Sequence, residues 1–319
     1  APQDSLRVVA NRIRPLFVRT TKGDLALPKP EVKTTPVKMG PVQASIYEGL
    51  RRRWRDAAQG GPIDVQIRQL GTVMTYLQMA ALHPGLLRKA LDETPAQRLE
   101  WPLSELPADA SLVDAILTYG SVEHPAKYDT LTAMVKENAE AGRKTLVWTT
   151  FIDSVNTIAN DVLAAFQPAV VHGSTPVDGD DADPALRKNQ ISRFRRDPDC
   201  WVLVANPAAM SEGISLHHEC HEAIYVDRSF NAGQFLQSVD RIHRLGLDPN
   251  EHTRIRVLAS TGTIDDVVAN RLETKTTALG LMLDDPELAL LQFTDEDETD
   301  YTLDEQDREA LLQHLRSRS

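Results

Sequence analysis

The chain has 319 residues, of which 41% are hydrophobic and 25% charged, ordinary values for a globular protein with one large or two modest domains. No apolar run approaches the roughly 18 residues that cross a membrane, and two cysteines exclude a disulfide framework and suit a reducing, cytoplasmic setting. The formal net charge of −11 resides in residues 284–309, which hold 12 acidic side chains and one basic one, so the rest of the chain is close to neutral.

Residues 1–41 are rich in proline and basic residues. Prolines stand at positions 28, 30, 36 and 41, where each interrupts a helix. The segment is predicted to be extended.

Residues 42–120 have a helical pattern, because apolar residues recur at steps of three and four, at Ile46, Leu50, Trp54, Ile67, Leu70, Val73, Met74 and Leu77. Trp54 and Tyr76 are interpreted as core residues, with base stacking as the alternative. The arginines at 51, 52, 53 and 55 are interpreted as a solvated helix face, with contact to nucleic-acid phosphates as the alternative.

Beyond residue 125 the pattern changes to short apolar runs rich in β-branched residues, with helical patterns between most of them. The runs are 146–148, 169–171, 202–204, 224–226 and 255–258. Asp153 is predicted to cap one helix, and Thr263 with Asp266 resembles a capping box that opens another. This alternation predicts a parallel sheet covered by helices on both faces. Ligands of such sheets bind beyond the carboxyl ends of the strands. The acidic residues 284–319 are predicted to be a solvated or interacting tail.

The most informative stretch runs from Gln237 to Gly246. On a helix, Gln237, Arg241 and Arg244 stand at positions i, i+4 and i+7, on one face. Two guanidinium groups that project in one direction suit a polyphosphate, because each offers a rigid and permanently charged fork. A solvated basic helix is the alternative interpretation of this stretch alone.

Other segments stand in a fixed order around that stretch. Met210–Leu216 carries Gly213, a strand then ends at Asp227, and Phe230-Asn231 follows. This succession resembles the closing motifs of superfamily-two helicases, specifically the Swi/Snf family of DNA-dependent ATPases. Further segments match the family in order, at Arg14–Lys22, Leu27-Pro28, Gln43, Tyr47, Lys127, Leu131, Phe151, His172–Thr175, Arg187 and Phe194.

The chain also departs from the family pattern. Phe230-Asn231-Ala232 stands where the family usually has Trp-Asn-Pro, Leu247 replaces a Gln, and residues 176–185 form an acidic insertion. No phosphate-cradling loop is present, because Gly142-Arg143-Lys144-Thr145 has the wrong spacing and precedes a strand. No Asp-Glu pair for magnesium follows a strand either. The resemblance places both features in a first lobe outside this sequence.

The segment His217-His218-Glu219-Cys220-His221 contains several potential zinc ligands. Tetrahedral sites use ligand pairs from two chain segments, whereas these ligands are contiguous and no second pair is evident, so no metal site is predicted. Cys200 is interpreted as a small buried hydrophobe. Nothing in the spacing brings Asp240 and Glu212 together as a catalytic carboxylate pair.

The resemblance implies a RecA-like parallel α/β lobe at 121–283. It is preceded by an interlobe linker at 1–41 and a helical insertion at 42–120, and followed by the acidic tail at 284–319. In the whole motor, ATP lies between two RecA-like lobes, and this lobe supplies the residues of the closing motifs. The implied catalytic residues are Arg241, Arg244 and Gln237; the implied ATP-binding residues are Gly213, Glu212 and Asp240; the implied DNA-binding residues are Thr149, Ser174, Ser211, Phe230 and Asn231.

The implied function is ATP-driven movement along double-stranded DNA that remodels protein–DNA complexes. ATP and Mg²⁺ would be held mainly by the first lobe, so this chain is expected to be inactive alone. The implied partners are double-stranded DNA, the first lobe in cis or in trans, and a protein that binds the acidic tail; no membrane is expected. The alternative is a non-catalytic module that binds DNA or protein. High usage of Ala, Arg and Asp favours a bacterial source.

Overall fold

The computed structural model describes residues 27–57, 63–88, 110–210, 214–248, 250–282 and 303–317. The chain divides into two compact units. The sheet unit is centred on Thr132–Val257, and the helical unit is centred on Pro36–Leu131 with Leu258–Val268 and the last helix. No helix in the described ranges combines the length and the apolar character needed to cross a membrane.

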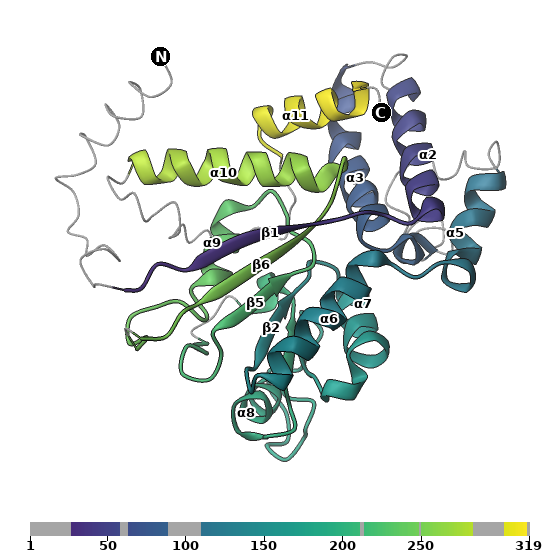
Figure 1. Cartoon of the computed structure of the whole chain (residues 1–319). Coiled ribbons are helices and arrows are strands. Elements are labelled where there is room, and N and C mark those ends of the chain that lie inside the picture. Colours follow the sequence, from purple (N-terminus) through teal and green to yellow (C-terminus); the bar gives the residue numbers. More distant parts are fainter. Residues whose placement is uncertain are drawn as a thin grey trace. The chain divides into compact units, whose positions relative to one another are not determined.

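A six-stranded sheet forms the core (Figure 1). Its strands are β1 (Glu31–Val37), β2 (Thr145–Trp148), β3 (Ala169–Val171), β4 (Val202–Ala205), β5 (Glu222–Tyr225) and β6 (Arg254–Ser260), in the spatial order β1-β6-β5-β2-β4-β3. The pairs β2–β4, β2–β5, β3–β4 and β5–β6 are parallel. Every residue of β2, β4 and β5 is buried, as expected for a sheet covered on both faces. The predicted strands and the predicted parallel sheet are therefore confirmed.

The register places the carboxyl ends of the central strands at one edge. Trp148 of β2 lies opposite both Ala205 of β4 and Tyr225 of β5. Val171 of β3 also pairs with Ala205. The residues that follow these strands therefore lie along the same edge of the sheet.

The helices alternate with the strands as predicted. From residue 126 onward they are α6 (Ala126–Glu140), α7 (Ile152–Thr157), α8 (Arg187–Arg196), α9 (Ala232–Val239) and α10 (Ile264–Met282). A π-helical turn at Ile158–Val162 and 3₁₀ turns at Ala164–Phe166 and Pro207–Met210 complete this part. The prediction that Asp153 caps α7 is wrong. The N-cap is Phe151, and Asp153 lies in the first turn, where its charge complements the helix dipole.

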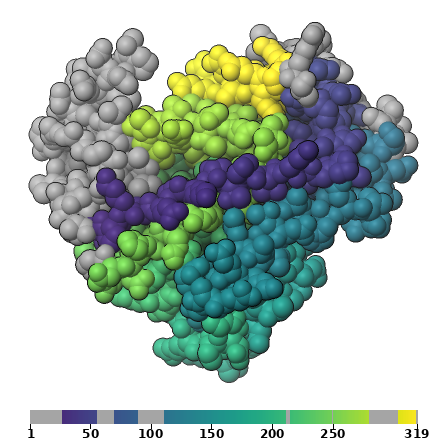
Figure 2. Space-filling view, in the orientation of Figure 1, coloured from purple at the N-terminus to yellow at the C-terminus, as the bar shows by residue number. Residues whose placement is uncertain are grey.

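The described part of the predicted extended segment contains strand β1, and residues 1–26 lie outside the described residues. Pro36 fits there because β1 is an edge strand, where a missing N–H removes no interior ladder hydrogen bond. Most β1 side chains are exposed, and Figure 2 shows them in purple on the visible face. The next proline, Pro41, is the first residue of α2, a position that tolerates it.

The helical unit contains α2 (Pro41–Ala57), α3 (Ile63–Leu82), a 3₁₀ turn (Pro84–Leu86), α5 (Ala110–Val122), the start of α6, the start of α10 and α11 (Glu305–Arg316). Trp54 and Tyr76 are buried, which confirms their interpretation as core residues.

Two side chains satisfy the helix ends in this unit. The Glu123 carboxylate accepts the Val42 and Gln43 N–H groups, each at 2.9 Å, at the start of α2. The Gln43 amide in turn donates to the Ala80 and Ala81 carbonyls, at 2.9 and 3.0 Å, at the end of α3. Helix ends leave such backbone groups without partners, so these contacts fix how the helices meet.

The described end of the acidic segment differs from the predicted solvated tail. Asp304 and Asp307 form a capping box that opens α11, and Leu311 and Leu315 are buried. The helix packs against α2 and α3, and the Tyr47 hydroxyl lies 2.7 Å from His314 Nε2. Burial of the apolar stripe outweighs the acidic composition over residues 303–317.

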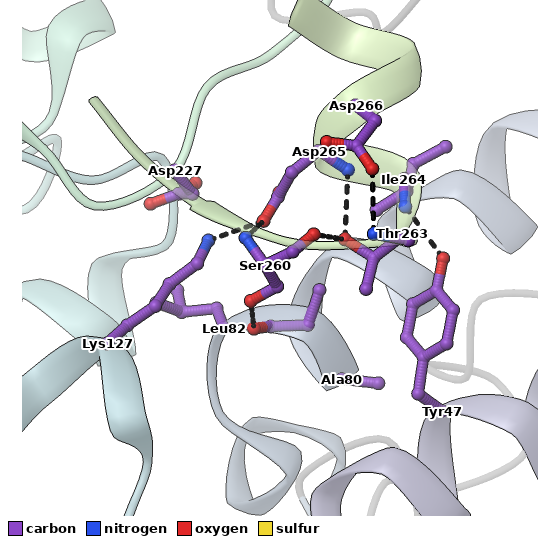
Figure 3. Close-up of polar contacts among 12 residues, drawn as sticks. Tyr47, Ala80, Leu82, Lys127, Asp227, Ser260, Thr263, Ile264, Asp265 and Asp266 are labelled. Carbon is purple, nitrogen blue, oxygen red and sulfur yellow. Dashed lines mark hydrogen bonds and ion pairs between the residues drawn. The ribbon is translucent and has the colours of Figure 1, made fainter. Parts of the chain in front are cut away.

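The start of α10 is held by buried polar groups (Figure 3). Lys127 Nζ lies 2.7 Å from Asp265 Oδ2, and both residues are buried. The same oxygen accepts the Ser260 N–H at 2.7 Å, while the Tyr47 hydroxyl accepts the Ile264 N–H at 2.7 Å. The predicted helix start at Thr263 is confirmed, although the Asp266 carboxylate accepts from Gly262, at 2.7 Å, and not from Thr263.

Removal of the buried lysine should destabilise the protein strongly. Lys127→Ala leaves the Asp265 carboxylate buried without its cation, so we expect the free energy of unfolding to fall by about 3–5 kcal/mol. Lys136→Ala is the matched control, since that lysine lies on the same helix with its side chain 67% exposed, and it should cost less than about 0.5 kcal/mol. Urea unfolding of both variants measures the difference, and equal stabilities would contradict the assignment.

Acid should weaken the docking of α11. Burial, reinforced by Arg51 and opposed by Glu48, lowers the pKa of His314 from 6.5 to about 4. Between these two pKa values, His314 is protonated in the unfolded chain and neutral in the folded chain. The stability that His314 contributes is complete above pH 6.5 and is lost as the pH falls towards 4.

Urea unfolding between pH 7 and 4.5 tests this dependence. Burial also lowers the pKa of His83 to about 4, and it lowers the pKa values of His172 and His217, so the wild-type slope has several sources with the same sign. We expect His314→Gln to flatten the slope and His252→Gln, at an exposed position, to leave it unchanged. A His314→Gln slope as steep as that of the wild type would refute the role of His314.

Candidate functional site

The predicted helix around Gln237 ends earlier than the sequence suggests. Asn231 caps α9 by accepting the Gln234 N–H at 2.9 Å, and the helix ends at Val239 with Asp240 as its C-cap. Beyond this end the chain is tied to a distant segment, because the Arg241 carbonyl accepts the Leu216 N–H at 2.7 Å. Residues 240–247, here called the arginine turn, follow as a series of turns.

The two arginines therefore do not share a helix face, and that prediction is wrong. Arg241 is 8% exposed, and its Nη1 donates to the Ile214 carbonyl at 3.0 Å. Burial lowers the pKa of Arg241, while the neighbouring Asp240 raises it, and the guanidinium stays charged at any ordinary pH. Arg244, by contrast, is exposed. Gln237 and Asp240 are half-buried.

The arginine turn joins three segments of the sheet unit. Arg241 binds residues 214–216 twice, through its side chain and through its carbonyl. His243 Nε2 donates to the Pro28 carbonyl at 2.8 Å. Gly246 has a φ of +99°, and a Cβ there would lie 3.0 Å from His217 Nε2, so the turn needs glycine. The arginine turn thus contacts both part of the predicted linker and part of the segment that follows Gly213.

Several other predicted site residues have structural roles. Thr149, predicted to bind DNA, is fully buried, and its hydroxyl donates to Ser154 Oγ at 3.0 Å. Phe230 is 5% exposed, and its carbonyl accepts from Lys275 Nζ at 3.1 Å. Its ring is therefore buried.

The remaining predicted residues are accessible or lie elsewhere. Ser174 is exposed in the loop after β3, and its N–H donates to His172 Nδ1 at 3.2 Å. Asn231 is exposed, with its amide oxygen used in capping α9. Ser211, Glu212 and Gly213 lie outside the described residues.

Sequence reasoning missed a polar group at the carboxyl edge of the sheet. Thr150 follows β2 and donates through both its N–H, at 3.1 Å, and its hydroxyl to the Asp227 carboxylate, which follows β5. The Asn206 amide, which follows β4, donates to the Thr150 carbonyl. The signal in the sequence was a polar residue soon after each buried run, because parallel strands end at one edge.

In residues 217–221, the ring centroids of His217 and His218 lie 3.9 Å apart, while the other side chains have separate surroundings. Cys220 is buried with its thiol against the carbonyls of Lys144 and Glu222, each at 3.3 Å, and burial raises its pKa to about 12. His221 Nε2 donates to the His217 carbonyl at 2.8 Å. In the part of the chain that the structure describes, no three His, Cys, Asp or Glu side chains are placed to hold a metal ion.

Arg51 is likewise more than a solvated helix residue. It is 5% exposed, its Nε lies 2.8 Å from Glu48, and its Nη1 donates to Ser317 Oγ at 3.2 Å. Arg51 therefore helps to hold α11, while Arg52 is exposed and paired with Glu48. Cys200 is fully buried, as predicted.

Residues 126–246 match the family described as the helicase conserved C-terminal domain. The TATA-binding protein-associated factor MOT1 of Saccharomyces cerevisiae is 19% identical over 285 residues, which cover 83% of this chain and 15% of that protein. Its Schizosaccharomyces pombe counterpart is 28% identical over 109 residues, which cover 34% of this chain and 5% of that protein. The chain thus spans only a small part of these relatives, which are yeast proteins and give no support to a bacterial source.

Two solved structures have the same fold. The C-terminal part of the Fun30 ATPase domain superposes with a TM-score of 0.59 at 18% identity, covering 91% of this chain and 97% of that one. The Sulfolobus solfataricus SWI2/SNF2 ATPase core in complex with dsDNA superposes with a TM-score of 0.53 at 19% identity, covering 84% of this chain and 49% of that one. The fold is therefore RecA-like, as predicted.

The two arginines should differ in their effect on stability. Arg241→Ala removes a charge-assisted hydrogen bond to a buried segment, so we expect the free energy of unfolding to fall by about 1.5–3 kcal/mol. Arg244→Ala is the matched control, because the side chain is exposed, and it should cost less than about 0.5 kcal/mol. Urea unfolding compares the variants, and an equal loss in both would show that Arg241 does not anchor the segment.

Proposed function

We propose that this chain is the helicase-like C-terminal lobe of a Swi/Snf-family protein and one half of an ATP-driven motor that moves along double-stranded DNA. The observation that carries the proposal is the arginine turn. There a permanently charged, exposed guanidinium stands next to a second one that is anchored to the segment following Gly213. The structural neighbour described as a complex with dsDNA supports the choice of DNA.

In this proposal Arg244 supplies an exposed fork to the phosphates of ATP held by a first lobe. Arg241 acts beside it, with one of its nitrogens bonded to Ile214 in the described state. Such arginine fingers stabilise the charge of the phosphoryl-transfer transition state and are worth on the order of 10³–10⁵ in rate. Gln237 would orient water or phosphate. Gly213, Glu212 and Asp240 would line the nucleotide, with Asp240 also ending α9.

The bound groups would be ATP and Mg²⁺. The described residues fit an anion, because Arg241 and Arg244 offer donors and permanent charge to a triphosphate. They do not offer a carboxylate cluster for a metal ion. We therefore assign Mg²⁺ to the first lobe. ATP would supply the phosphoryl group. This chain's residues would bind and orient the triphosphate and screen its charge.

For DNA we propose backbone contacts from hydroxyl and amide groups. Ser174 and Asn231 are exposed at loops that leave the carboxyl edge of the sheet, and Ser211 would act with them. Contacts of this kind bind phosphates without reading base sequence. The structural roles of Thr149 and Phe230 remove both from the proposed DNA surface.

A non-catalytic binding module is the second candidate. It is favoured by the burial of Arg241 and its bond to Ile214, which give that arginine a structural use without any ATP chemistry. The two functions differ in the effect of Arg244, since a binding module has no need of an exposed guanidinium aimed at a phosphate.

Loss of the exposed arginine should stop hydrolysis without loss of folding. In a protein that carries both lobes, we expect Arg244→Ala to lower the DNA-stimulated turnover number for ATP by about 10³-fold or more. Arg244→Lys should not rescue it, because a point charge lacks the planar fork. Arg316→Ala, at an exposed arginine of α11, is the control and should leave turnover unchanged. Wild-type turnover in Arg244→Ala would favour the binding module.

A further inference from the structure

We propose that Arg195, near the end of α8, is a positioning residue for the segment Ile214–Glu219. It would hold this segment so that the backbone after Gly213 faces the nucleotide in a fixed geometry. The positional claim stands on contacts within this chain. Its consequence for catalysis rests on the function proposed above.

Arg195 contacts both ends of the segment. Its Nη2 donates to the Ser215 carbonyl at 2.5 Å, and its Nε lies 3.9 Å from the Glu219 carboxylate. The ion pair is partly exposed, with side chains 36% and 30% accessible, so salt and solvent weaken it. The hydrogen bond to the carbonyl is therefore the main link, and its charged donor makes it stronger than a neutral one.

A second arginine, Arg241, holds the segment at the neighbouring peptide group. Arg241 donates to the Ile214 carbonyl at 3.0 Å, and Arg195 donates to the next carbonyl along the chain. These two guanidinium groups come from different elements, the end of α8 and the arginine turn. Two links at adjacent peptide groups leave the backbone that follows Gly213 little freedom to rotate, which is the preorganisation that a catalytic loop requires.

The end of α8 is a rigid support for this contact. Phe194 is fully buried, and Lys144 Nζ donates to the carbonyls of Phe194 and Asp197, at 2.5 and 2.7 Å. Arg193 Nη2 donates to the Gln167 carbonyl at 2.9 Å. Arg195 thus reaches the segment from a helix end that is fixed on two other sides. Arg196 beside it is exposed as well.

Hydrogen–deuterium exchange on this chain tests the positional claim. The Leu216 N–H bonds to the Arg241 carbonyl, and the Cys220 N–H bonds to the Leu216 carbonyl, so both amides report on the segment. We expect Arg195→Ala to speed exchange at these amides by about tenfold, with the amides of β2 unchanged. Arg196→Ala is the matched control and should exchange like the wild type. Equal exchange in Arg195→Ala and Arg196→Ala would overturn the proposal.

Turnover in a protein that carries both lobes tests the catalytic consequence. We expect Arg195→Ala to lower the DNA-stimulated kcat for ATP by about tenfold, with the KM for ATP little changed, because the segment is present but poorly positioned. Arg195→Lys should restore most of kcat, since one N–H suffices for the carbonyl. Faster exchange with unchanged kcat would refute the catalytic role. A wild-type protein without ATPase activity would refute the proposed function, while exchange would still decide the positional claim.

Discussion

The hydrogen bond from the Leu216 N–H to the Arg241 carbonyl organises the candidate site. It ties residue 241, just beyond the end of α9 at Val239, to the segment that follows Gly213. The Arg241 side chain also binds this segment, at Ile214, whereas Arg244 is exposed. Two contacts with residues 214–216 thus distinguish an anchoring arginine from one that is exposed to a ligand.

The sheet could be predicted from the sequence because its signals are local. Short β-branched runs bounded by helical patterns mark β2 to β6, and their parallel pairing follows from the alternation itself. The carboxyl edge was also predictable as the place for polar residues. The sequence did not predict which of the two adjacent threonines would be buried. Thr149 extends the β2 hydrogen bonding and is buried, and Thr150 reaches Asp227 instead.

The site and the acidic segment depend on contacts distant in sequence, which local patterns do not contain. Spacing alone favoured one helix from Gln237 to Arg244, but α9 ends at Val239 and Arg241 binds the distant Leu216. Composition alone favoured a solvated tail, yet Leu311 and Leu315 fall four residues apart and bury against the helical unit. In both cases a long-range contact decides between two locally acceptable conformations.

The central claim is that this chain provides one side of a nucleotide site that needs two lobes. The most direct measurement is DNA-stimulated ATP hydrolysis by the pure chain and by the same chain joined to a lobe that carries a phosphate-binding loop. The account predicts hydrolysis only in the joined protein, because the described residues hold arginine donors without a carboxylate cluster for Mg²⁺. Equal DNA-stimulated hydrolysis by the chain alone would contradict it.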